Sequence, residues 1–411
     1  MHIMRLPLAP NGQKLATMFL LSCRKAFLPM PFLLSPSLLS RMAIAGVAAA
    51  TLAIALPTTP ALALHMPKVA ELSGSALTPA IQSDKQVWDA VVPLPDGRFV
   101  LQAPIWVGNT GPQLSIRATD GTFAPYPDTA WNATEGEPSQ RIVSAAGLTL
   151  MADGTLWVLD SGVPNHKAAP IAAPKLVQID THQNKVVRTL TLEQKALHPE
   201  SIVSGVAVHA DTAYVADSGI GGILVIDLKT GSTRRFLDRH PSLVATRPIT
   251  TPQGPVHSTN GNLLAIDASM IAVSPDGKWI VVQPPGGYLS RVETSIFTDP
   301  DVTAAALEES VTQWFKTPAL GGMTIGPDGT LYWSDISTGS ILSYTTGRVP
   351  RRLITDNRLK WPATPGLDTS GHLYVPAAQL DHTAAFTGGQ SSVVWPVTVY
   401  KLALPTTPPP T

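Results

Sequence analysis

The chain has 411 residues, with 29 basic and 29 acidic side chains, 44% hydrophobic residues and a single cysteine. The balanced charge argues against a nucleic-acid-binding surface, and one cysteine excludes a disulfide framework. A chain of this length can still bury a large core without covalent cross-links.

The N-terminal segment, residues 1–63, is predicted to be a cleaved signal peptide. Residues 42–56 form an apolar run that follows Arg41 and precedes Ala61-Leu62-Ala63, which has the small-x-small form of a signal-peptidase site. The run is shorter than the roughly 20 residues that span a bilayer as a helix, so we expect no permanent membrane anchor. We expect a secreted or periplasmic protein.

Two alternatives concern this N-terminal segment. Translation from Met30 would give the signal a more usual length, and a lipoprotein signal ending at Cys23 is a second possibility. Removing residues 1–63 takes away five basic and no acidic residues, which leaves 29 − 5 = 24 basic against 29 acidic residues and a net charge of −5. An acidic chain of this kind is not expected to bind nucleic acid.

A strand–turn–strand pattern recurs six times along the rest of the chain. Each copy has a turn pair followed by a short run of β-branched and aromatic residues, as a β-hairpin requires. Most copies follow a short apolar strand that opens on a small residue. The six copies are residues 94–102, 151–160, 209–217, 274–283, 326–335 and 368–376.

Six such units predict an all-β fold, a six-bladed β-propeller over residues 64–404, because four-stranded blades bury their faces against their neighbours. Residues 174–180 and 222–231 are predicted third strands of two blades. A β-helix would need much shorter repeats, and a sandwich would not need six copies. Residues 405–411 form a Pro-rich C-terminal tail.

Two features outside the hairpins are also predicted. A short helix between blades four and five would be capped by Asp299, would have Pro300 in its first turn, and would present Leu307, Val311, Trp314 and Phe315 on one face. The ring is expected to close by pairing the two ends of the chain, residues 66–72 with residues 393–404, which would protect an exposed sheet edge.

The order of these motifs resembles the major royal jelly protein/yellow family, whose bacterial members are secreted six-bladed propellers related to gluconolactonase-type propellers. The motifs are WDAVVPLPDGRFV, GNTGPQLSIRATDGTFAPYPDTAWN, LWVLDSG, GVAVHADTAYVADSGIGGILVIDLKTG and RLKWPATPGLDTSGHLYVPAAQL, between Trp88 and Leu404. The resemblance implies binding of small ligands, including aromatic amines, and a link to pigment chemistry. The resemblance also extends to the related lactonase propellers, which hold a divalent metal on the channel axis.

The positions that would carry such a metal are the residues just before the innermost strands. Asp89 is the one carboxylate at these positions; the others are Ala146, Ser204, Ser269, Gly321 and Thr364 or Pro365. This set is a poor cage for calcium, which takes six or more oxygen ligands. Glu200, Asp267 and Asn262 stand nearby in the sequence and are weak substitutes.

Three aspartates end the second strand of their hairpins. Asp160, Asp217 and Asp335 are each expected to accept backbone N–H bonds from the following turn, or alternatively to face the channel as counter-charges. Trp131 and Trp361 are candidates for stacking on a ligand or for packing between blades. The candidate ligand-binding residues are Asp89, Trp131, Asn132, Asp160, Asp217, Asp335, Trp361 and Gln379.

The leading functional hypothesis is a secreted propeller that binds a small organic molecule, aromatic or amine-bearing, at one end of its channel. The alternatives are a metal-dependent lactonase-like hydrolase, with calcium as its cofactor, and a cofactor-free tautomerase. The sequence contains neither a G-x-S-x-G elbow nor an H-E-x-x-H motif. It leaves open whether the protein is an enzyme, and it indicates no oligomeric state.

Overall fold

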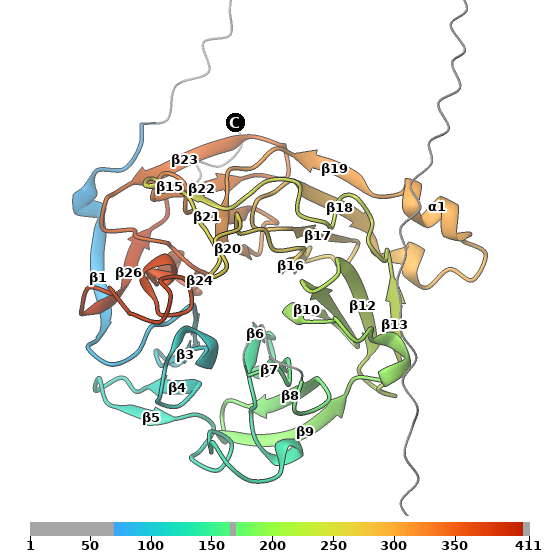
Figure 1. The fold of residues 1–411 in the computed structure, drawn as a ribbon, viewed down its shortest axis with the longest axis horizontal. Coiled ribbons are helices and arrows are strands. Elements are labelled where there is room, and N and C mark those ends of the chain that lie inside the picture. The colour runs from blue at the N-terminus through green and yellow to red at the C-terminus, as the bar shows by residue number, and fades with distance from the viewer. Residues whose placement is uncertain (1–69, 165–169, 406–411) are drawn as a thin grey trace, which may run out of the picture. The chain divides into compact units, whose positions relative to one another are not determined.

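The computed structural model describes residues 70–164 and 170–405. In these ranges, six four-stranded antiparallel sheets surround a central axis as the blades of a propeller (Figure 1). The predicted six-bladed all-β fold is confirmed. The predicted signal peptide and nearly all of the Pro-rich tail lie outside the described residues.

Blades one to three follow each other along the chain, each running from an inner to an outer strand. Blade one consists of β2 (Ala90–Pro93), β3 (Phe99–Gln102), β4 (Leu114–Arg117) and β5 (Phe123–Pro125). Blade two consists of β6 (Ala145–Leu150), β7 (Thr155–Asp160), β8 (Lys175–Asp180) and β9 (Lys185–Thr191). Blade three consists of β10 (Val203–His209), β11 (Thr212–Asp217), β12 (Gly222–Asp227) and β13 (Thr233–Phe236). The predicted third strands are therefore β8 and β12.

Blades four and five repeat this order, and blade six joins both ends of the chain. Blade four consists of β16 (Met270–Val273), β17 (Trp279–Gln283), β18 (Leu289–Glu293) and β19 (Thr312–Phe315). Blade five consists of β20 (Leu320–Ile325), β21 (Leu331–Asp335), β22 (Ser340–Tyr344) and β23 (Pro350–Thr355). Blade six consists of β24 (Gly366–Leu367), β25 (His372–Ala377), β26 (Val397–Ala403) and β1 (Leu77–Ser83).

The remaining elements lie in the connections. A small hairpin of β14 (Thr250–Thr251) and β15 (Gly254–Pro255) precedes blade four, and α1 spans Ala304–Glu309. Single 3-10 turns are η1 (Gly74–Ala76), η2 (Ile105–Val107), η3 (Pro138–Gln140), η4 (Gln194–Ala196), η5 (Thr294–Phe297) and η6 (Leu380–His382). Among the described residues, no helix is long and apolar enough to cross a membrane.

Successive side chains along each strand point alternately to the two neighbouring blades, and this alternation builds the core between blades. In β11, Ala213 and Val215 pack in the cluster shared with blade two, whereas Tyr214 and Ala216 pack in the cluster shared with blade four. Successive side chains of a strand point to opposite faces, so a run of apolar residues buries both faces of a blade. This period of two is why six short apolar hairpins close into one ring.

Glycines in the inner strands let neighbouring blades approach each other around the axis. A Cβ on Gly205 would lie 2.4 Å from the carbonyl oxygen of Ser269, and a Cβ on Gly322 would lie 2.3 Å from the Cα of Thr364. Any side chain there would push adjacent inner strands apart.

Ring closure through the two chain ends is confirmed, but the predicted N-terminal partner was wrong. The strand that pairs with β26 is β1, with Leu77 opposite Leu402 and Ser83 opposite Val397. Leu77 and Ile81 supply the buried face that this edge requires. Leu72, in the predicted segment, instead donates its N–H to the carbonyl of Leu353 in blade five.

The helix also differs from the prediction. It begins after Thr303, whose hydroxyl accepts the N–H of Ala306 at 3.1 Å. It lies in the connection between β18 and β19 at the outer edge of blade four, and not between blades four and five (Figure 1). Trp314 and Phe315 belong to β19, where Phe315 pairs with Leu289. Aromatic packing on Tyr344 of blade five favours the strand over a longer helix.

Candidate functional site

The centre of the propeller holds a cavity of about 1170 Å³. The inner strands β2, β6, β10, β16, β20 and β24 form its wall, and most of the residues that they contribute are apolar. Asp89 and Asp368 are the titratable side chains in the described lining, which contains no Lys, Arg or His. A cavity of this size accommodates a small organic molecule.

Asp89 stands at one end of this wall, directly before β2. Its Oδ1 accepts the Nε2–H of Gln102 at 2.9 Å, and no other residue of the described chain donates a hydrogen bond to its Oδ2. Burial raises the pKa of Asp89 to about 7, although the hydrogen bonds from Gln102 and from its own backbone N–H act in the opposite direction. The carboxyl group therefore changes its charge near neutral pH.

An apolar cluster covers the Asp89 end of the cavity, and we call it the cap. Its aromatic centre is Phe386, which stacks on Trp361 with ring centroids 6.0 Å apart and meets Trp106 edge-on at 5.9 Å. The cap lies near Asp89 because the N–H of Thr364, three residues after Trp361, donates to the Asp89 carbonyl at 2.9 Å. The cap residues that line the cavity include Trp106, Leu264, Ile266, Trp361, Leu380 and Phe386.

Two bulky residues at the cap have left-handed backbone conformations. Trp361 has φ 44° and Gln379 has φ 50°, and they face each other through hydrogen bonds between their backbone segments. The Gln379 side chain is not part of the described cavity lining; it bonds both the N–H and the carbonyl of Val394. Such conformations persist only where the surrounding structure enforces them. Gln379 thus anchors the segment that follows Phe386.

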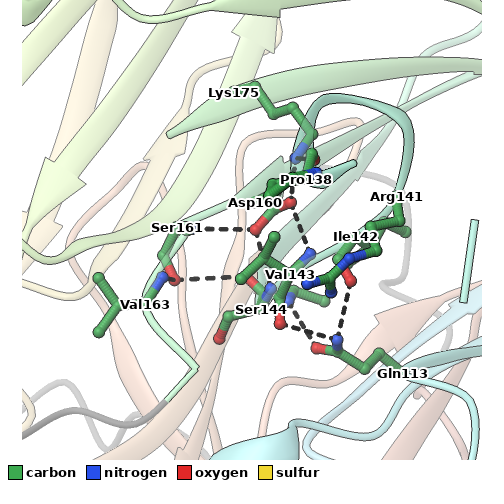
Figure 2. A network of polar contacts seen from close by, with 12 residues as sticks. Gln113, Pro138, Arg141, Ile142, Val143, Ser144, Asp160, Ser161, Val163 and Lys175 are labelled. Atoms are coloured by element: carbon green, nitrogen blue, oxygen red, sulfur yellow. Dashed lines mark hydrogen bonds and ion pairs between the residues drawn. The ribbon is translucent and has the colours of Figure 1, made fainter. Parts of the chain in front are cut away.

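Asp160 occupies a fully enclosed corner of blade two and does not line the cavity. Figure 2 shows the polar contacts that surround its carboxylate. Its carboxylate accepts the N–H groups of Val143 and Ser144 at 2.8 Å and that of Gly162 at 3.0 Å. Lys175 places its Nζ 2.5 Å from Oδ2 and also donates to the carbonyl of Pro138. This is the structural arrangement expected for the carboxylate, with a buried cation added.

Asp217 and Asp335 occupy the same position in blades three and five, and neither lines the cavity. Asp217 accepts the N–H groups of Ile202 and Gly219 and pairs with Arg235 at 2.9 Å. Asp335 is held by the backbone and hydroxyl groups of Ser337 and Thr338. Both carboxylates cap turns.

Trp131 and Asn132 also lie away from the described cavity lining. Trp131 packs on the core between blades one and two. The Asn132 side chain accepts the N–H of Leu114 at 3.0 Å and donates to the carbonyls of Tyr126 and Asp128. Of the eight candidate ligand residues, Asp89 and Trp361 line the cavity.

The predicted inner-strand positions are in the cavity wall, but they do not form a metal cage. Ala146, Ser204, Ser269, Gly321, Thr364 and Pro365 all line it. Glu200, Asn262 and Asp267 are outside its described lining, and Asp267 instead accepts the N–H of Ala245 at 2.8 Å. No three His, Cys, Asp or Glu side chains cluster within residues 70–164 and 170–405. One carboxylate beside hydroxyl groups does not fit calcium.

Sequence reasoning missed Gln102, Trp106, Phe386 and Lys175. Gln102 had a detectable signal, because it pairs with the first residue of β2 just as Asp160 pairs with the first residue of β6. Aligning the repeats marks Gln102 as the blade-one equivalent of the buried aspartates. Trp106 and Phe386 are far apart in the sequence and had no comparable signal.

These features define the class of protein as a six-bladed β-propeller with an apolar central cavity. Residues 143–252, from the start of blade two to β14, match the model of the major royal jelly protein family. The family resemblance is therefore confirmed over this part of the chain.

Two curated relatives come from Apis mellifera. Major royal jelly protein 1 is 30% identical over 142 residues, which cover 32% of this chain and 30% of that protein. Major royal jelly protein 7 is 29% identical over 122 residues, which cover 27% of each chain. The matched segment spans less than a third of either relative.

Solved structures with a similar arrangement include two bacterial enzymes. A gluconolactonase from Xanthomonas campestris is 12% identical, with a TM-score of 0.46 over 78% of this chain and 87% of that one. A virginiamycin B lyase from Staphylococcus aureus is 13% identical, with a TM-score of 0.44 over 80% of this chain and 99% of that one. At this level of identity the likeness concerns the fold.

Proposed function

We propose that this protein is a secreted propeller that binds a small aromatic amine in its central cavity. The observation that carries the proposal is that Asp89, a carboxylate with one uncommitted oxygen, lines the same mostly apolar cavity as the aromatic cap residues Trp106, Trp361 and Phe386. The ammonium group would lie against Asp89, and the aromatic ring would lie among the apolar side chains.

Elementary electrostatics supports a cationic ligand. A carboxylate in a weakly solvated wall attracts a positive charge more strongly than one in water. The faces of Trp and Phe rings attract cations as well, with the strongest effect at desolvated sites. The described lining offers no basic side chain to compete with the ligand for Asp89.

The experiment is a thermal-shift screen of the exported protein with tryptamine and tryptophol, which share an indole ring but differ in charge. We expect tryptamine to give the larger shift, and Asp89→Asn to weaken tryptamine binding about tenfold or more, since one ion pair in a buried site is worth over 1 kcal/mol. Asp84→Asn is the matched control, because Asp84 is exposed in the loop before Asp89. Equal binding of both indoles by all three proteins would contradict the proposal.

The secretion part of the proposal has its own test. N-terminal sequencing of the exported protein is expected to begin at Leu64, after Ala61-Leu62-Ala63. A lipid-modified chain that begins at Cys23 would contradict it.

A second candidate, a cofactor-free tautomerase, is favoured by one observation. Because the pKa of Asp89 is about 7, this carboxyl can both accept and donate a proton at physiological pH. The test is deuterium incorporation from solvent into aromatic keto–enol compounds, which Asp89→Asn should abolish. Incorporation that persists in the variant would exclude Asp89 as the proton carrier.

A further inference from the structure

We propose that cation binding in the central cavity is coupled to the release of one proton from Asp89, so that the cavity holds an organic cation at neutral pH and above and releases it on acidification. This inference rests on the proposed function, since it concerns how the same cavity is regulated. It assigns Asp89 and Gln102 together as a proton-linked binding pair.

The geometry gives Asp89 two distinct oxygens. Oδ1 is fixed by the side-chain amide of Gln102, which is itself 4% exposed and keeps the carboxyl group in one orientation. Oδ2 accepts no hydrogen bond from any other residue of the described chain and belongs to a residue that lines the cavity. A proton and a ligand cation therefore compete for the same oxygen.

The groups around Asp89 in the described chain include no cation that would pair with its carboxylate. β3 contributes the neutral Gln102, blade six contributes the backbone N–H of Thr364, and the described cavity lining contributes no Lys, Arg or His. Burial, the Gln102 hydrogen bond and the residue's own N–H account for the pKa of Asp89, without a contribution from a neighbouring charge. The charge of another side chain is thus not among the causes that shift the pKa of Asp89.

The charged groups elsewhere on these elements are already engaged or lie outside the cavity wall. Asp368, the other titratable lining residue, bonds the Nδ1 of His372 at 3.0 Å and the backbone N–H groups of Ser370 and His372. Burial alone would raise the pKa of Asp368, but the bonds from His372 and Ser370 lower it below its usual value. In the connections that form the cap, Lys360, Asp381 and His382 are outside the described lining.

Linkage fixes the direction of the effect. Below its pKa, Asp89 is neutral and must lose a proton before it can pair with a cation, so the association constant falls about tenfold per pH unit. Above its pKa the carboxylate is already ionised, and the affinity no longer changes. A neutral ligand of the same shape gains nothing from ionisation and should show no such slope.

The test is isothermal titration calorimetry of the exported protein between pH 5.5 and 8.5. The probes are N,N,N-trimethyltryptammonium, whose charge does not depend on pH, and neutral tryptophol. We expect trimethyltryptammonium affinity to rise about tenfold per pH unit below pH 6.5 and to level off above pH 7.5. Measurements in buffers of different ionisation enthalpy should show up to one proton released per cation bound, whereas tryptophol binding should not depend on pH.

Two substitutions and a control assign the effect. Asp89→Asn should abolish the pH slope while tryptophol still binds, which also shows that the variant is folded. Gln102→Met should move the midpoint to higher pH, because it removes a hydrogen bond that lowers the pKa of Asp89. The exposed-site control Asp84→Asn should keep the wild-type slope.

The outcomes separate the two proposals. Cation binding without a pH slope, or a slope that survives Asp89→Asn, would overturn proton coupling and leave the binding function intact. If the wild-type protein binds neither probe at any pH, the proposed function and the coupling are both wrong.

Discussion

Blades one and two each place a carboxyl group at the same end of their inner hairpins, but the one in blade two is buried and the one in blade one is half-buried. In blade two, Asp160 accepts three backbone N–H groups and pairs with Lys175. In blade one the equivalent position holds Gln102, and the carboxyl group is on Asp89, where a single side-chain amide meets it.

Burial alone therefore does not identify a functional acid. Asp160 is buried, and both of its carboxylate oxygens already accept hydrogen bonds from the protein. It therefore stabilises the connection between β6 and β7 and is not available to a ligand. Asp89 has lost much of its water without gaining a cation, so ionisation costs energy in the folded protein. A carboxyl with uncommitted bonding capacity on a cavity wall is the functional candidate.

The largest expected effect comes from breaking the blade-two corner. Asp160→Asn leaves Lys175 buried without its counter-charge and should lower the free energy of unfolding by about 3–5 kcal/mol. Urea denaturation measures it, with the exposed hairpin-turn variant Asp153→Asn as the control. A loss no greater than that of the control would show that the ion pair contributes little.

In blade one, by contrast, removing the carboxylate is expected to raise the free energy of unfolding. The pKa of Asp89 is about 7 in the folded protein, above the value near 3.9 of an unfolded aspartate, so its contribution to stability is greatest below pH 4 and is lost as the pH rises to 7. Asp89→Asn should therefore raise the free energy of unfolding at pH 8 by about 1–3 kcal/mol and change it little at pH 4. A destabilised variant at pH 8 would place Asp89 with the structural aspartates.

Intermediate losses are expected at the two other equivalent corners. Asp217→Asn should cost about 2 kcal/mol, because Arg235 keeps Asp238 as a partner, and Asp335→Asn should cost about 1 kcal/mol, because hydroxyl and N–H groups hold it. Denaturation of both variants beside Asp160→Asn gives the order. Equal losses at all three corners would mean that pairing with Lys175 or Arg235 does not determine how much each carboxylate contributes to the free energy of unfolding.

The smallest effect is expected from Gln102→Leu. This substitution removes the amide that holds Asp89 and also an Oε1 atom that is buried without a hydrogen-bond partner. The two changes act in opposite directions, so stability at pH 5 should change by less than about 1 kcal/mol. A large loss, measured by urea denaturation, would reveal a structural role for this amide.

The propeller was predictable because its signal is local and repeated. Runs such as residues 213–216 encode two buried faces, and the turn pairs fix where each hairpin bends. The helix boundary was not predictable in this way, because Trp314 and Phe315 have helical spacing from Leu307 but pack as strand residues on Tyr344. Tertiary contacts override a short periodic pattern.

The site was predictable in part. Asp89 could be found from its place before the first inner strand, but its raised pKa depends on burial in the folded chain. The cap joins Trp106, Trp361 and Phe386 across blades one and six, and no spacing rule links residues so far apart in the sequence. Side-chain convergence of this kind is visible only in the folded chain.

Titration of Asp89 itself tests most directly whether this carboxyl group is the proton-linked ligand group. In the exported protein labelled with ¹³C at aspartate carboxyl groups, the Asp89 resonance can be assigned by its loss in Asp89→Asn. We expect a midpoint at about pH 7, which moves to lower pH when trimethyltryptammonium is bound. A midpoint near 3.9, the value of an ordinary aspartate, would contradict it.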